Sequence, residues 1–186
     1  YDPFLYVDRG KIYNEKGMYK EALADFNKAI KLDSLCADAY LNRGLTRARL
    51  ENFNDAITDY EKAAQLDPDN AEIYLRRGIS YANKNELEKS IADVNKALGL
   101  NDKYAEAYLN RGNLYFNKGE NDAAIADYTK AIELDGQYAE SFFNRGVVYA
   151  KTRDFKQAIY DYTKALDLRP DFAEILFNRA NVYFNQ

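Results

Sequence analysis

The polar residues that could do chemistry in this chain recur at fixed intervals and do not gather at one point. Arginine is followed five times by an aspartate at the same distance further along the chain: Arg9 and Asp25, Arg43 and Asp59, Arg77 and Asp93, Arg111 and Asp127, and Arg145 and Asp161. A guanidinium and a carboxylate form ion pairs in a two-contact geometry. The regular spacing favours structural ion pairs, and a ladder of arginines that binds a ligand is the alternative.

Residues for catalysis or metal binding are scarce. The chain has no histidine and a single cysteine, Cys36. Histidine is the commonest general base and metal ligand, so neither a Cys/His zinc site nor histidine-dependent catalysis is expected. Cys36 lies in an internal repeat, and three later copies have an aromatic residue at its position: Tyr104, Tyr138 and Phe172. This favours a packing role for Cys36 over a nucleophilic one. We therefore expect no enzyme activity, no metal and no cofactor.

This internal repeat defines the elements that must position the side chains named above. Five full copies cover 3–36, 37–70, 71–104, 105–138 and 139–172, and a partial copy covers 173–186. Small residues recur at positions 8, 20 and 27 of the copies, and large aromatic residues recur at positions 4, 11 and 24. Alternating small and large residues at helical spacing lets two helices interlock. Each full copy is therefore predicted to be a helix A followed by a helix B, giving eleven helices and no strand.

The glycines support this prediction. Position 8 of the five full copies is Gly10, Gly44, Gly78, Gly112 and Gly146. A glycine inside a helix costs about 1 kcal/mol relative to alanine, so we expect two backbones to approach closely there. The remaining glycines fall in the predicted turns or near the ends of B helices, and none is left for a loop that cradles phosphate.

These features resemble the tetratricopeptide repeat family over essentially the whole chain. The 34-residue period, the small and aromatic positions, and Pro68 and Pro170 in the corners between repeats carry the resemblance. It implies an all-α fold, a right-handed superhelical solenoid of antiparallel helix hairpins, as a single domain over 1–186. The chain departs from the family by having arginine at position 7, where leucine is common, and by an irregular third repeat.

The resemblance also implies a binding groove along the concave wall, formed by positions 2, 5, 6, 9, 12 and 13 of the A helices. Position 5 is apolar in every copy, and position 6 is mostly asparagine, whose amide can pair with a peptide backbone. The expected peptide-binding residues are Asn42, Asn110, Asn113, Asn117, Asn144, Asn178 and Asn181, with Phe143 and Phe177. Two alternatives stay open: the apolar side chains pack between neighbouring A helices, and the asparagines form only a solvated surface.

The groove also limits the class of partner. The family's chaperone-type carboxylate clamp needs lysine at position 5 of one repeat and at position 2 of another, and this chain has neither. Position 2 is acidic from Asp38 to Glu174, which offsets the helix dipoles and should disfavour acidic ligands. We therefore expect a protein or peptide partner other than an acidic C-terminal chaperone tail.

Composition excludes further classes of partner. The net charge is −4 and the pI about 5.1, so the chain lacks the basic surplus that neutralises nucleic-acid phosphates. No run approaches about 20 apolar residues, so no membrane span is expected. A single cysteine fits a reducing compartment such as the cytoplasm without requiring one.

Three functions stay open at this point. The favoured one is a scaffold that binds an extended peptide segment in its concave groove. The alternatives are a structural module that self-associates and a recruitment domain of a larger enzyme. The final helix has no helix B after it and carries Leu176, Ala180 and Tyr183 at the positions that such a helix would cover, so a homo-oligomer through this helix is possible. The chain begins with Tyr1, not methionine, and can also be part of a longer protein, whose truncation would explain this face.

Overall fold

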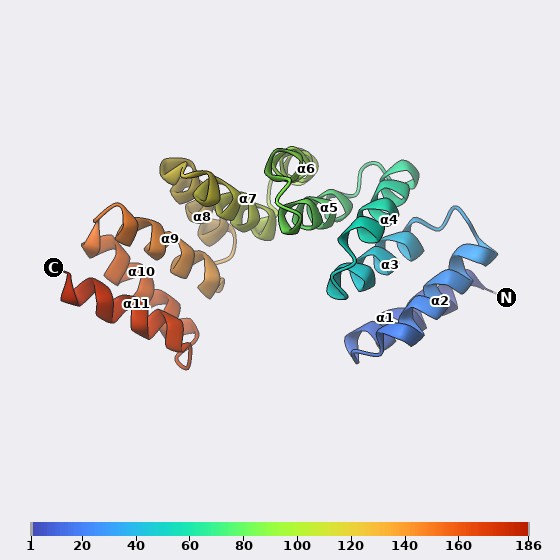
Figure 1. The fold of residues 1–186 in the computed structure, drawn as a ribbon, viewed down its shortest axis with the longest axis horizontal. Coiled ribbons are helices and arrows are strands. Elements are labelled where there is room, and N and C mark those ends of the chain that lie inside the picture. Colours follow the sequence, from blue (N-terminus) through green and yellow to red (C-terminus); the bar gives the residue numbers. More distant parts are fainter. Residues whose placement is uncertain (1, 186) are drawn as a thin grey trace. The chain divides into compact units, whose positions relative to one another are not determined.

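The computed structural model describes residues 2–185, which form eleven α-helices and no strand (Figure 1). The helices are α1 (Pro3–Glu15), α2 (Tyr19–Leu32), α3 (Ala37–Arg49), α4 (Phe53–Leu66), α5 (Ala71–Asn83), α6 (Leu87–Leu100), α7 (Ala105–Lys118), α8 (Asn121–Leu134), α9 (Ala139–Lys151), α10 (Phe155–Leu168) and α11 (Ala173–Phe184). The odd-numbered helices are the A helices of the six repeats, and the even-numbered helices are the B helices. The predicted all-α fold of antiparallel hairpins is confirmed.

Each hairpin turns at the same place in the repeat, through one residue with a left-handed backbone. The φ angle is 73° at Gly17 and 80° at Gly119, where glycine adopts it without strain. It is 60° at Glu51, 60° at Asn85 and 64° at Arg153, where a side chain must tolerate it. The turn geometry is thus constant, although the residue type is not.

The helices of a hairpin interlock through the glycine of helix A and the large residue at position 24 of helix B. A Cβ atom added at Gly44 would lie 2.7 Å from Cε1 of Tyr60, and one at Gly112 would lie 2.6 Å from Cε1 of Tyr128. Both rings are almost fully buried. The glycines therefore make room for these rings, which accounts for a residue type that is otherwise unfavourable within a helix.

The chain divides into two compact units, residues 1–101 and residues 102–186. The first contains α1–α6 and the second α7–α11, so the division falls in the loop between α6 and α7. Each unit has its own buried side chains between A and B helices, among them Phe26 and Tyr60 in the first unit and Tyr128 and Tyr162 in the second. The single domain expected over 1–186 stays a prediction.

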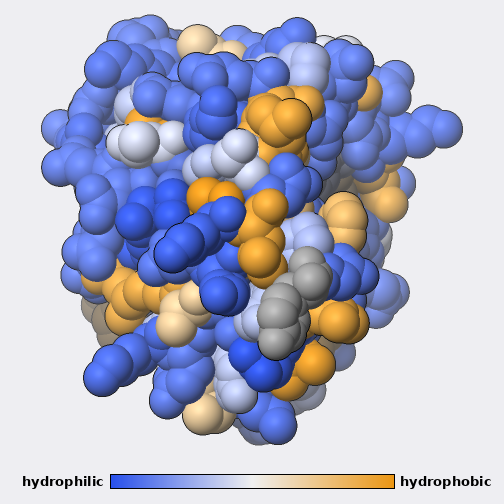
Figure 2. All heavy atoms as spheres, turned by 90° about the vertical axis from the view of Figure 1, so that its right-hand side faces the viewer, coloured by the Kyte–Doolittle hydropathy of each residue, from blue (hydrophilic) through white to orange (hydrophobic). Residues whose placement is uncertain are grey.

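One face of helix α1 is exposed, whereas the same face of α5 is covered by the preceding repeat. Leu5 and Ile12, at positions 3 and 10 of α1, are 68% and 51% exposed, whereas Ile73 and Ser80 at the same positions of α5 are 1% exposed each. The preceding repeat packs its helix α4 against α5, and α1 begins the unit without such a neighbour. Figure 2 shows this end of the first unit, where hydrophobic residues lie scattered among hydrophilic ones.

Candidate peptide-binding groove

The A helices of the second unit form two hollows in the same register of successive repeats. The first, the α7–α9 hollow, measures about 320 Å³ and is lined by Asn113, Phe116, Asn117, Tyr128, Asn144 and Val147. The second, the α9–α11 hollow, measures about 520 Å³ and is lined by Ala150, Lys151, Arg153, Phe155, Tyr162, Asn178, Asn181, Val182 and Asn185. Five of the six residues of the first hollow have their counterpart, one repeat later, in the second. The repeat therefore generates the same kind of cavity twice.

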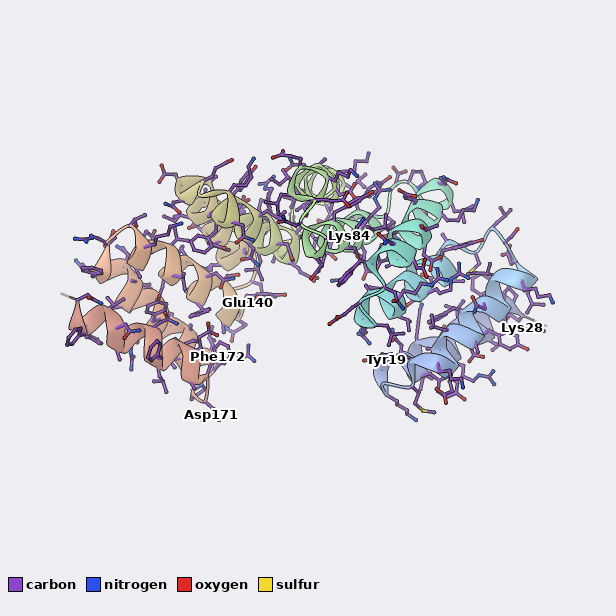
Figure 3. The ribbon with its side chains drawn as sticks, in the orientation of Figure 1. Tyr19, Lys28, Lys84, Glu140, Asp171 and Phe172 are labelled. Atoms are coloured by element: carbon purple, nitrogen blue, oxygen red, sulfur yellow. The ribbon has the colours of Figure 1, made fainter. Side chains whose placement is uncertain are left out.

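A third hollow, the Glu140 hollow, lies where α9 and α11 begin. It measures about 340 Å³ and is lined by Ala139, Glu140, Phe143, Asn144, Arg169, Phe172, Glu174 and Ile175. Figure 3 shows Glu140 and Phe172 at this same end of the second unit. The guanidinium of Arg169 lies 5.0 Å from the centre of the Phe172 ring. Asn144 lines both this hollow and the α7–α9 hollow, so the two are adjacent.

Two of the predicted asparagines bond to each other across neighbouring repeats. The Oδ1 atom of Asn113 accepts hydrogen bonds from the Nδ2 group of Asn144 at 2.9 Å and from the hydroxyl of Tyr128 at 2.8 Å. Within residues 2–185, Nδ2 of Asn113 and Oδ1 of Asn144 make no hydrogen bond. The pair thus offers amide N–H donors and an acceptor oxygen next to the α7–α9 hollow.

The other position-6 asparagines are arranged differently. Asn42, Asn110 and Asn178 each donate their amide to the backbone carbonyl one turn earlier, on Asp38, Glu106 and Glu174, at 2.7–2.9 Å. This bond is the usual local competitor for a short polar side chain in a helix. Each of these amides therefore has one of its two N–H donors occupied within its own helix, and Asn42 is buried. Asn117 and Asn181 are exposed and line the two hollows.

In the first four repeats, the apolar side chains at position 5 pack in the core, which was the alternative to lining a groove. Val7, Leu41, Leu75 and Leu109 are all buried, so they belong to the core and not to an open groove. Phe143 is half-buried, with its ring centre 5.9 Å from that of Tyr162 and 6.0 Å from that of Phe172. Phe177 is 67% exposed. Of the six residues at position 5, only Phe143 and Phe177 are therefore accessible to a ligand.

The five arginine–aspartate pairs all lie in contact across their hairpins. The shortest N–O distances are 2.6–2.8 Å, for Arg9 and Asp25, Arg43 and Asp59, Arg77 and Asp93, Arg111 and Asp127, and Arg145 and Asp161. The aspartates are buried. The guanidinium of each of these arginines is thus bound by a carboxylate of its own repeat.

Some of these arginines also reach back to the preceding repeat. Arg43 donates to Oδ1 of Asn27 at 2.7 Å, and Arg145 donates to Oγ1 of Thr129 at 2.9 Å. Both acceptors lie on the previous helix B. One guanidinium thus joins three consecutive helices, B–A–B, which explains why arginine can replace the leucine that the family often has here.

Sequence reasoning passed over Lys151 and Arg153, which line the α9–α11 hollow. A comparison of the turns would have found them, because Asn117 and Gly119 stand at the same places one repeat earlier. Cys36 is buried, and burial raises the pKa of its thiol, which disfavours a nucleophilic thiolate. Within residues 2–185, no group of acidic and cysteine side chains is arranged to hold a metal ion, and no helix is long and apolar enough to cross a bilayer.

Two solved structures match the chain along most of its length, and a curated protein matches a short part of it. The solved structure of YrrB, described as a TPR protein with an unusual peptide-binding site, is 26% identical, with a TM-score of 0.74 over 96% of this chain and 92% of that one. The crystal structure of MamA is 28% identical, with a TM-score of 0.77 over 89% of this chain and 96% of that one. Protein SGT1 homolog of Oryza sativa subsp. japonica is 49% identical over 47 residues, which are 25% of this chain and 13% of the rice protein.

Two family models cover the repeats themselves. The model described as TPR repeat matches residues 10–51, 46–85, 80–119 and 112–152, and the model described as Tetratricopeptide repeat matches residues 139–172. Together they cover well over half of the chain, and the second match coincides with the fifth repeat. The chain belongs to the tetratricopeptide repeat family.

Proposed function

We propose that this chain is a protein-interaction scaffold that binds an extended peptide segment of a partner along the A helices of its second unit. The observation that carries the proposal is the pair of hollows in the same register, the α7–α9 hollow and the α9–α11 hollow. Each combines asparagine side chains with an aromatic and aliphatic lining. A repeated cavity suits a ligand that is itself a repeating polymer.

An extended peptide fits this lining chemically. Its backbone presents unpaired N–H and C=O groups, and its side chains alternate in direction along the strand. Nδ2 of Asn113 and Oδ1 of Asn144 can bond to such a backbone, and Phe116 and Val147 can receive an apolar side chain. The description of YrrB as having a peptide-binding site supports the same proposal for this chain.

The partner is not expected to be an acidic C-terminal chaperone tail. Position 5, which carries a lysine in the clamp that binds such tails, is apolar in all six copies and buried in the first four. The acidic position 2 places Glu140 and Glu174 on the Glu140 hollow. Arg169 in the same lining offsets only one of these two carboxylates, so a cationic or neutral side chain of the peptide is favoured at that end of the A helices.

Selection of peptides tests the proposal directly. Residues 1–186 are immobilised, a random displayed peptide library is selected, and the affinity of an enriched synthetic peptide is measured by fluorescence anisotropy. Phe116→Ala should weaken binding by about tenfold or more, because it removes an apolar contact from the α7–α9 hollow. Tyr160→Ala is the matched control, since Tyr160 is an exposed aromatic residue on helix B.

The possible results are distinct. Loss of affinity in Phe116→Ala with no change in Tyr160→Ala supports the groove. Equal affinities for both variants and the unchanged protein would place the peptide elsewhere. If the library yields no enriched peptide at all, the chain does not bind extended peptides and the proposal is wrong.

Self-association through α11 is the second candidate function. This helix exposes Leu176, Phe177, Tyr183 and Phe184 by 46%, 67%, 57% and 90%. Several large apolar side chains on one short helix are unusual for a surface that faces only water. Light scattering at rising concentration tests this alternative. A mass that rises in the unchanged protein, but not in Leu176→Glu with Tyr183→Glu, would favour it, and a constant monomer mass would exclude it.

A further inference from the structure

The α9–α11 hollow contains two cationic side chains that have no carboxylate partner. Lys151 ends α9 and Arg153 lies in the turn that follows, and both are exposed. Neither forms an ion pair within residues 2–185. The Lys151 ammonium lies 4.6 Å from the centre of the Phe116 ring, which holds it between the two hollows. The neighbouring Asp154 is engaged as the cap of α10, where its Oδ1 accepts from the backbone N–H of Gln157 at 3.2 Å.

Arg153 occupies a backbone position that is unfavourable for its residue type. Its φ is 64°, close to the 60° of Glu51 and Asn85 in the equivalent turns, whereas Gly17 and Gly119 adopt the same conformation as glycines. A left-handed backbone is strained for a residue with a long side chain. Within the described part of the chain, no hydrogen bond or ion pair of the Arg153 side chain offsets this strain.

The preceding hollow provides an internal comparison. At the places equivalent to Lys151 and Arg153, the α7–α9 hollow has Asn117 and the adjoining turn has Gly119. Asn144 and Asn178 lie at corresponding places in the two hollows, as do Tyr128 and Tyr162. The two hollows are therefore similar in lining but differ in charge, the first being neutral and the second basic.

We propose that the α9–α11 hollow binds a side-chain carboxylate, from an aspartate or glutamate of the peptide that occupies the groove. The Arg153 fork and the Lys151 ammonium supply the charge, and the amides of Asn178 and Asn181 lie beside them in the same lining. This inference rests on the proposed function and adds the residue class that the peptide presents at this repeat: a neutral or apolar side chain at α7–α9, and an acidic one at α9–α11.

The acidic row at the start of the A helices does not oppose this assignment. Glu140 lies in the first turn of α9, and Lys151 is the last residue of the same helix. A rise of about 1.5 Å per residue separates their backbones by about 16 Å, roughly twice the Debye length of about 8 Å at physiological salt. Water and ions therefore screen Glu140 from a carboxylate at Lys151. The groove has an acidic and a basic end, which also gives the peptide a preferred direction.

The test exchanges the charged pair for the residues of the preceding repeat. The variant Lys151→Asn with Arg153→Gly carries the same residue types as 117 and 119, in a turn that glycine suits better. Peptides selected on the unchanged protein are synthesised in three forms. The first is unchanged and has a free C-terminus, the second has its acidic residue changed to glutamine or asparagine, and the third has an amidated C-terminus. Affinities are measured by anisotropy, and folding is checked by thermal unfolding.

We expect the library to be enriched in peptides with an acidic residue. Changing that residue to its amide should weaken binding to the unchanged protein by about five- to tenfold, as expected for a charge-assisted contact at an exposed site. The double variant should bind the acidic and amide forms equally, while its melting temperature stays the same or rises. C-terminal amidation should have no effect, because the proposed ligand group is a side chain.

Other outcomes overturn the inference. If selected peptides lack acidic residues, or if both proteins discriminate equally between the acidic and amide forms, peptides bind the groove but not through Lys151 and Arg153. If only C-terminal amidation weakens binding, the ligand group is a terminal carboxylate and the side-chain assignment is wrong. If no peptide is enriched, the proposed function fails and this inference fails with it.

Discussion

Arg145 and Asp161 join α9 and α10 through two parallel contacts. Nε of Arg145 donates to Oδ2 of Asp161 and Nη2 donates to Oδ1, each at 2.8 Å. The Asp161 side chain is 0% exposed and that of Arg145 is 13% exposed. Burial raises the pKa of Asp161, and the guanidinium acts in the opposite direction. The carboxylate therefore depends on Arg145 to remain charged inside the hairpin.

Removing this guanidinium should be costly. Arg145→Ala leaves the Asp161 carboxylate buried without its partner, and the free energy of unfolding should fall by about 3 kcal/mol. Urea denaturation followed by circular dichroism measures it. Arg9→Ala is the matched control, because Arg9 makes the same two contacts to Asp25 but its side chain is 56% exposed. Its loss should be smaller, because water already reaches the Arg9 side of that pair, although Asp25 itself is buried. Equal losses would contradict the role assigned to burial.

Two glycines should respond in opposite directions to the same substitution. Gly112→Ala places a Cβ atom 2.6 Å from the Tyr128 ring, and the helices must separate, at a cost of about 1–3 kcal/mol. Gly99 lies in α6 with nothing within 4 Å of an added Cβ atom. Gly99→Ala should therefore stabilise the protein by about 0.5–1 kcal/mol. Thermal unfolding of the two variants decides, and a loss of stability in Gly99→Ala would be inconsistent with the open space there.

The hairpin turn of the fifth repeat should become more stable without its side chain. Arg153→Gly removes a non-glycine residue at φ 64°, and the free energy of unfolding should rise by about 1 kcal/mol. The reverse exchange, Gly119→Arg at φ 80°, should lower it by a similar amount. Chemical denaturation of both variants checks the pair. Destabilisation by Arg153→Gly would show that the arginine makes an internal contact that contributes more to stability than the backbone strain costs.

Alkaline pH should unfold the hairpins through their buried tyrosines. Burial raises the pKa of Tyr162 to about 12, and burial also raises the pKa values of Tyr60 and Tyr128. Because the unfolded value is about 10, the folded state favours the neutral phenol. The resulting stability is fully present below pH about 10 and is lost as the pH rises towards about 12. Stability measured across this range by denaturation should fall steadily.

Tyr162→Phe is the control for that titration. Phe26 stands at the equivalent position of the first repeat, so the substitution should leave stability at neutral pH nearly unchanged. It removes one of the raised pKa values, and the loss of stability at high pH should become less steep. An unchanged slope would show that other groups govern alkaline unfolding.

The sequence by itself determined the fold and the contacts within each hairpin. The unbroken phase of the repeat predicts all eleven helices. The residues of each arginine–aspartate pair, such as Arg111 and Asp127, lie in contact as their constant spacing suggested. These features are predictable because a repeat contacts mainly itself and its neighbours, so short sequence separations specify most of its packing.

Which side chains a ligand can reach depends on the packing of the folded chain. Leu41 and Leu109 share a column with Phe177, yet the leucines are buried and Phe177 is exposed. Asn110 bonds to its own helix, whereas Asn144 bonds to Asn113 of the preceding repeat. Identical repeat positions thus differ because exposure and hydrogen bonding depend on the neighbouring helix and on each side-chain rotamer. The period of the sequence specifies neither of these.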